Sequence, residues 1–177
     1  MDGYKRTLIR RLKFKSREVG EELSNCKEIY EKAFHLFYSA VLEYCDSNNI
    51  KDPFSNSPSP KSEEKKTSLT SDFKKIFRQI ATRTHTDVTK DEASRPLLDK
   101  AVKAKKENKS NDLMTLAHDL KIDVSNIDYK SIGHLEKSIE EAKSEIDTMH
   151  SSYPWVWFYS DDVKKKSIIK VFASRKV

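Results

Sequence analysis

The sequence contains few of the residues that turn or break a chain, with three glycines and five prolines among 177 residues. An all-β fold needs turn residues at close intervals, so this shortage argues against it and favours long helices. Only two cysteines occur, and neither a Cys-x-x-Cys pair nor a metal-site spacing accompanies them. We interpret Cys26 and Cys45 as core residues of a protein in a reducing compartment.

Several signatures of other protein classes are also missing from the sequence. No apolar run approaches the roughly 18 residues of a membrane span, and the N-terminus has no apolar signal-peptide core. Neither a Gly-x-Ser-x-Gly elbow, a Gly-rich phosphate loop nor His-Glu-x-x-His is present. His35, His118, His134 and His150 lie in separate segments without metal-ligand spacing. The sequence therefore predicts a cytoplasmic, non-enzymatic protein with no membrane anchor, metal or cofactor.

Charge and hydrophobicity are almost equal in amount, at 35% charged and 36% hydrophobic residues, which leaves little material for a large core. We therefore expect an elongated all-α protein. The net charge of +6, from 34 basic and 28 acidic residues, is compatible with an acidic partner.

Apolar residues at steps of three and four predict a first long helix over about residues 17–46, beginning as early as Tyr4. Its apolar face consists of Val19, Leu23, Cys26, Tyr30, Ala33, Phe37, Val41 and Tyr44. Residues 1–46 thus form one segment, basic at its start. Residues 47–70 are rich in Ser, Asn, Pro and Lys, which predicts a flexible linker.

Residues 71–125 predict a helical hairpin followed by a short helix. Ser71 is the expected N-cap of the first hairpin helix, and a second should run from about Arg95 to Lys106. The apolar faces that should meet comprise Phe73, Ile76, Phe77, Ile80 and Ala81 on one helix and Leu97, Leu98, Ala101 and Ala104 on the other. The short helix NDLMTLAHDL follows.

Residues 126–177 predict a second long helix and an aromatic end. The apolar seam Ile132, Leu135, Ile139, Ala142, Ile146, Met149 and Tyr153 is typical of a coiled coil. Only the first helix matches its length, so we predict an antiparallel pairing of residues 17–46 with 130–153; a homodimeric coiled coil is the alternative. A closing helix capped by Ser160, with Trp155 and Trp157 before it, completes the chain.

The stretch FKKIFRQIATRTHTD, Phe73 to Asp87, joins a basic amphipathic helix to His-Thr-Asp. It resembles the second helix and loop of a J domain, the DnaJ-type co-chaperone module. That family shows an apolar residue, two lysines, a small and an aromatic residue, Arg, a variable residue, Leu and Ala before His-Pro-Asp. The residues of this chain keep that register, with Thr86 in place of the proline. The flanking segments are similar to truncated J-domain-like proteins of phages, other viruses and bacteria.

The resemblance implies a J-domain-like hairpin mounted on the coiled coil, and a DnaK-type ATPase chaperone as the partner. The chaperone-binding residues would be Lys74, Lys75, Arg78, Arg83, His85, Thr86 and Asp87. The motif leaves the client protein open. Threonine lacks the fixed φ of proline, and no Tyr-x-x-Leu-Gly helix precedes residue 71, so binding without stimulation of ATP hydrolysis is one alternative. A structural coiled-coil component, in which His85 and Asp87 are freely replaceable, is another.

The N-terminus holds the strongest basic cluster, which consists of Lys5, Arg6, Arg10, Arg11, Lys13 and Lys15. Apolar and aromatic residues such as Tyr4, Leu8 and Phe14 interleave with it. The pattern fits a contact with nucleic acid or an acidic protein, as in a polymerase-associated accessory protein, and it equally fits a solvated helix face.

Overall fold

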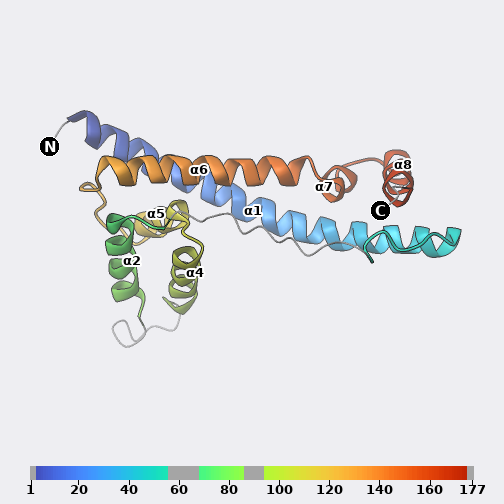
Figure 1. Ribbon diagram of the computed structural model, residues 1–177, viewed down its shortest axis with the longest axis horizontal. Coiled ribbons are helices and arrows are strands. Elements are labelled where there is room, and N and C mark those ends of the chain that lie inside the picture. The colour runs from blue at the N-terminus through green and yellow to red at the C-terminus, as the bar shows by residue number, and fades with distance from the viewer. Residues whose placement is uncertain (1–2, 56–67, 86–93, 175–177) are drawn as a thin grey trace. The chain divides into compact units, whose positions relative to one another are not determined.

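The computed structural model describes residues 3–55, 68–85 and 94–174, which form seven α-helices and no strand (Figure 1). The helices are α1 (Gly3–Asn48), α2 (Ser71–Thr84), α4 (Arg95–Lys106), α5 (Ser110–Asp119), α6 (Tyr129–His150), α7 (Tyr153–Phe158) and α8 (Asp162–Ala173). The prediction of an all-α protein is therefore confirmed. The chain divides into two compact units, a hairpin unit (residues 1–22 and 64–144) and an aromatic unit (residues 23–63 and 145–177).

In the hairpin unit, α2 and α4 lie side by side and α5 crosses them at one end (Figure 1). The backbone N–H of Leu69, just before α2, donates to the side chain of Asn108, just after α4 (3.2 Å), so the two helices are antiparallel as predicted. Their apolar faces meet through buried Phe73, Ile76 and Ile80 on α2 and through two alanines on α4. The small alanines let the two helices approach closely.

Most predicted seam residues of α1 and all of those on α6 are buried, with Tyr30 and Tyr44 half-buried, but the predicted antiparallel direction is wrong. In the hairpin unit, the Lys5 ammonium lies 5.4 Å from the Tyr129 ring centroid and the Lys15 ammonium 3.3 Å from a Glu140 carboxylate oxygen. Ten residues along α1 thus correspond to eleven along α6 in the same direction. An apolar seam looks alike in both directions, so the direction depends on such polar contacts and on the connecting segments.

Three helices end in the left-handed conformation without a glycine. Asn49, Asn108 and Lys121 have φ values of 53°, 57° and 52°, whereas no described glycine has a positive φ. In each case the next residue donates its backbone N–H to the carbonyl five residues earlier, at 2.8–2.9 Å, which is the Schellman pattern. These turns redirect the chain after α1, α4 and α5.

The aromatic unit shows that part of the predicted linker is folded. Its core contains Phe37, Val41, Cys45 and Ala173, and Ile50 and Phe54 pack against this core. Leu69 and Thr70, at the other end of the predicted linker, are buried in the hairpin unit. Helix α1 also extends to Asn48, so the predicted flexible linker at residues 47–70 is wrong for its first two residues.

Two predicted helix caps are shifted by one residue. Thr70 and not Ser71 precedes the first residue of α2, and its side chain makes no capping hydrogen bond. Asp161 and not Ser160 caps α8, by accepting from the Lys164 N–H at 2.8 Å. The short helix α7, capped by Ser152, was not predicted.

Candidate functional site

Helix α2 has one buried and one basic face. Phe73, Ile76 and Ile80 point into the hairpin unit, whereas Lys74, Lys75 and Arg78 are exposed. The i, i+3 and i+4 spacings within each set separate the two faces on the helix. Lys74, Lys75 and Arg78 lie within the first ten residues of α2, and a partner can therefore reach them there.

The charges on this face differ in what they contact. Lys75 lies 3.5 Å from Asp72 in the same helix, and the two groups form an ion pair in the first turn. Among the described residues, no acidic side chain pairs with Lys74 or Arg78. Lys74 and Arg78 are consequently the cations of α2 that are most available for an ion pair with a partner.

Arg83 has a structural role that the sequence did not reveal. Its guanidinium donates a hydrogen bond to the carbonyl oxygen of Leu120, the C-cap residue of α5. A cation at this position satisfies a carbonyl that the helix leaves unpaired and complements the negative helix end. Arg83 thus joins the end of α2 to α5.

The loop after α2 begins at His85. Its backbone leaves the helical conformation (φ −69°, ψ 128°), while its N–H still donates to the Ala81 carbonyl at 2.9 Å. The His85 side chain is exposed, and the preceding Thr84 is fully buried with its hydroxyl donating to the Ile80 carbonyl. Thr86 and Asp87, the other two residues of the predicted tripeptide, lie outside the described residues.

Helix α4 extends the basic surface beyond the residues predicted from the motif. The Lys105 ammonium lies 4.4 Å from the ring centroid of half-buried Phe77 on α2. Residues 71–85 and 94–106 contain nine basic and two acidic side chains, a difference of seven charges. The described hairpin is therefore much more basic than the chain as a whole, whose net charge is +6.

A polar junction anchors the start of α2 to the start of α6. The Asp72 carboxylate accepts hydrogen bonds from the backbone N–H of Asp128 (2.8 Å) and from the Ser131 hydroxyl (3.1 Å). The Thr70 and Ser131 hydroxyls lie 2.7 Å apart. These contacts fix the direction in which α2 leaves α6.

A second polar cluster joins α5 to α1 and α6. The buried Ser16 hydroxyl lies 2.7 Å from the Asn111 side-chain oxygen, and the Ser138 hydroxyl accepts from the Asn111 N–H at 3.1 Å. Thr115 donates towards the carbonyls of Ser16 and Asn111 at 3.2 and 3.1 Å, and Gly20 leaves room for its side chain. The basic hairpin is thus held by directional contacts as well as by apolar packing.

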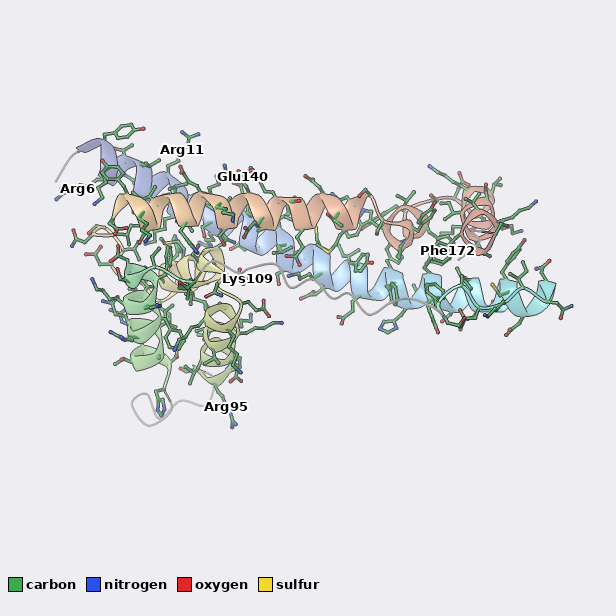
Figure 2. All side chains as sticks on the ribbon, in the orientation of Figure 1. Arg6, Arg11, Arg95, Lys109, Glu140 and Phe172 are labelled. Carbon is green, nitrogen blue, oxygen red and sulfur yellow. The ribbon has the colours of Figure 1, made fainter. Side chains whose placement is uncertain are left out.

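The N-terminal basic residues are divided between internal and outward positions. Lys5 lies against the Tyr129 ring and Lys15 pairs with Glu140, so both contribute to the packing of α1 on α6. Lys13 is half-buried, whereas Arg6, Arg10 and Arg11 are exposed. Figure 2 shows the labelled Arg6 and Arg11 side chains extending outward from the first turns of α1.

Cysteine and histidine contacts give no sign of a metal centre in the part of the chain that the structure describes, where no group of three or more His, Cys, Asp or Glu side chains converges. Cys26 and Cys45 are buried and not joined in a disulfide, and the Cys26 sulfur lies 3.4 Å from a ring nitrogen of His150. His118 and His134 are half-buried within the hairpin unit. None of the described helices is long and apolar enough to cross a membrane.

Comparison of the chain with known protein families, with characterised proteins and with solved structures finds no match.

Proposed function

We propose that this protein is a non-enzymatic, J-domain-like adaptor that binds a DnaK-type ATPase chaperone. The observation that supports the proposal most directly is the exposed basic face of α2, in which Lys74, Lys75 and Arg78 precede exposed His85. This is the order of the basic residues and the histidine in the J-domain motif that the sequence resembles. The bound client remains open.

The electrostatics of the hairpin favour a partner with an acidic surface. Nine basic side chains against two acidic ones produce a positive potential that accelerates the encounter with such a surface. Lys74 and Arg78 are exposed and pair with no acidic side chain among the described residues, so their charges can attract an acidic partner. The positive charge therefore raises the association rate, and we expect the specific contacts to come from the loop.

The loop offers an imidazole at its first residue and, two positions later in the sequence, the carboxylate of Asp87. Both groups make directional hydrogen bonds, and neither needs a cofactor. Thr86 lacks the ring that fixes φ in proline, so the loop loses more conformational entropy when it binds. We therefore propose that the adaptor binds the chaperone and stimulates ATP hydrolysis less than a His-Pro-Asp loop would.

The direct test is single-turnover ATP hydrolysis by a DnaK-type chaperone with and without the full-length protein. We expect stimulation that His85→Gln and Asp87→Asn abolish and that Thr86→Pro increases. If wild type is inert and only Thr86→Pro stimulates, the loop retains the contact but not the stimulation. If all four proteins are inert and none binds the chaperone, the proposal is wrong.

A charge-reversal pair tests the basic face separately from the loop. Lys74→Glu with Arg78→Glu should weaken chaperone binding by about tenfold or more, mainly through a slower association rate. The matched control is Lys164→Glu with Lys166→Glu, which changes the same number of charges at exposed positions on α8. Surface plasmon resonance gives both rates, and equal losses in the two pairs would contradict a binding face on α2.

A further inference from the structure

We infer that the first turns of α1 form a binding surface for single-stranded nucleic acid, a function distinct from chaperone binding. The surface consists of the exposed residues Tyr4, Thr7, Arg10, Arg11 and Phe14.

The five residues of α1 lie on one outward face because of their spacing. Tyr4 and Thr7, Thr7 and Arg10, and Arg11 and Phe14 are three positions apart, and Thr7 and Arg11 are four apart. The opposite side of the same turns contains buried Ile9, Leu12 and Ser16. From Tyr4 to Phe14 the face is about 15 Å long at 1.5 Å per residue.

The charge of this face suits a polyanion. Residues 3–17 contain seven basic side chains and no acidic one. Lys15 and Arg17 form ion pairs with Glu140 and Glu21. Arg10 and Arg11 have no acidic partner among the described residues, so their guanidinium groups remain available. The planar guanidinium binds phosphate oxygens in pairs, as it also binds carboxylates, so the two arginines suit the phosphates of a polyanion.

The exposed rings distinguish nucleic acid from other polyanions and single strands from duplexes. Tyr4 and Phe14 are 71% and 54% exposed, which is high for rings of this size. Phe14 touches His118 edge-on at 5.9 Å between ring centroids, so one side of its ring remains open. Alternating rings and cations bind unpaired bases by stacking while the phosphates meet the cations; paired bases in a duplex do not offer their faces.

Fluorescence anisotropy of a labelled oligothymidylate with the full-length protein tests the inference, with the equivalent DNA duplex alongside. We expect the single strand to bind more tightly than the duplex, with an affinity that falls as salt is added. Arg10→Gln with Arg11→Gln should reduce the slope of log K against log salt by about 1.4, since each lost phosphate contact on a single strand accounts for roughly 0.7.

A second variant separates stacking from charge. Phe14→Leu keeps an apolar side chain beside His118 but removes the ring, and it should weaken binding about tenfold while leaving the salt slope unchanged. The matched charge control is Lys164→Gln with Lys166→Gln on α8, which should bind as wild type does. Circular dichroism checks that each variant keeps its helices.

The inference would be overturned by no binding at low salt, by equal affinity for single strand and duplex, or by arginine variants that bind like the α8 control. Unchanged binding by Phe14→Leu would reduce the surface to a nonspecific polyanion site and would also overturn it. The α1 variants should leave chaperone stimulation unaltered, so the outcome is independent of the proposed chaperone contact.

Discussion

Asp72 connects two segments of the hairpin unit through a single carboxylate. It accepts from the Asp128 backbone N–H and the Ser131 hydroxyl, and it lies in the first turn of α2, where negative charge is favourable. We expect Asp72→Ala to lower the free energy of unfolding by about 1–2 kcal/mol. Urea denaturation followed by circular dichroism measures this loss. Asp99→Ala, at an exposed site on α4, should cost much less, and equal costs would contradict the junction's role.

Lys121 occupies a left-handed position that glycine adopts without strain. Its φ is 52°, and the following Ile122 N–H donates to the Ala117 carbonyl at 2.8 Å. Lys121→Gly should therefore raise the free energy of unfolding by about 0.5–1 kcal/mol, because it relieves the crowding of Cβ. Thermal denaturation tests this expectation. Lys121→Gln removes the same charge but keeps Cβ, so it should show no comparable gain.

Two carboxylates link stability to acid pH. The hydrogen bond from the backbone N–H of Ser131 holds the pKa of Asp128 below its ordinary value. Hydrogen bonds from the backbone N–H and hydroxyl of Ser125 hold the pKa of Asp123 below its ordinary value. A lowered folded-state pKa stabilises the protein above the ordinary aspartate range, and the contribution is lost as pH falls through the lowered pKa.

We therefore expect the urea midpoint to fall as the pH drops below about 4, the ordinary range of aspartate. Asp128→Asn combined with Asp123→Asn should make this fall shallower, since an asparagine still accepts at these turns but does not titrate. Denaturation midpoints measured from neutral to acid pH give the comparison. A double variant with the wild-type pH profile would assign the acid sensitivity to other groups.

At the scale of the helices, Gly20 and Gly133 are both interior helical glycines but differ in what surrounds them. A Cβ at Gly133 would meet nothing within 4 Å, whereas one at Gly20 would lie 3.0 Å from the Thr115 hydroxyl oxygen. Gly133→Ala should raise the free energy of unfolding by about 0.5–1 kcal/mol through helix propensity. Gly20→Ala should bring no such gain, because the bonded Thr115 must shift. Equal gains in chemical denaturation would contradict the close approach of α5 to α1.

The parallel direction of α1 and α6 is accessible to zero-length cross-linking. The Lys15 ammonium and a Glu140 carboxylate oxygen are 3.3 Å apart, within reach of a carbodiimide-activated amide bond. We expect a peptide joining these residues in a tryptic digest analysed by mass spectrometry, and Lys15→Arg should abolish it. Cross-links between residues near 17 and near 153 would instead support the antiparallel arrangement.

The limits of sequence reasoning are clearest at these helices. Periodicity located the α4 boundaries at Arg95 and Lys106 and the buried face of α6 because apolar spacing determines which side is buried. It did not determine the helix direction, which depends on contacts between residues far apart in the sequence. It also missed Ile50 and Phe54, because two apolar residues in a polar segment form no periodic pattern. Their burial depends on a core formed by residues elsewhere in the sequence.

The candidate site was predicted only in part, because local spacing indicates exposure but not contacts between residues far apart in the sequence. The exposure of Lys74 and Arg78 follows from their spacing against the apolar face of α2, which the sequence contains. The hydrogen bond from Arg83 to the Leu120 carbonyl joins residues 37 positions apart, and no local sequence pattern predicts it. Arg83→Ala should accordingly reduce stability as well as any binding, whereas changes at Lys74 should affect binding alone.

On the scale of the whole molecule, charge and aromatic rings are divided between the two units. Twelve of the seventeen aromatic residues, including both tryptophans, belong to the aromatic unit, with five in the hairpin unit. The aromatic unit is packed largely through rings, such as Phe37 against Phe172 at 5.1 Å between centroids. The two basic surfaces that we propose for partners both belong to the hairpin unit. Tryptophan emission therefore reports on the unit that is outside the proposed sites.

The net charge of +6 adds a long-range attraction to the local contacts of α2. If the chaperone contact is electrostatically steered, its association rate should fall by about tenfold or more between low and physiological salt, with a smaller change in dissociation rate. Stopped-flow mixing over a range of salt concentrations measures both rates.

Lys74→Glu with Arg78→Glu should flatten the salt dependence, while Arg10→Gln with Arg11→Gln should change it only slightly. The opposite order of effects would place the chaperone contact on α1 rather than α2.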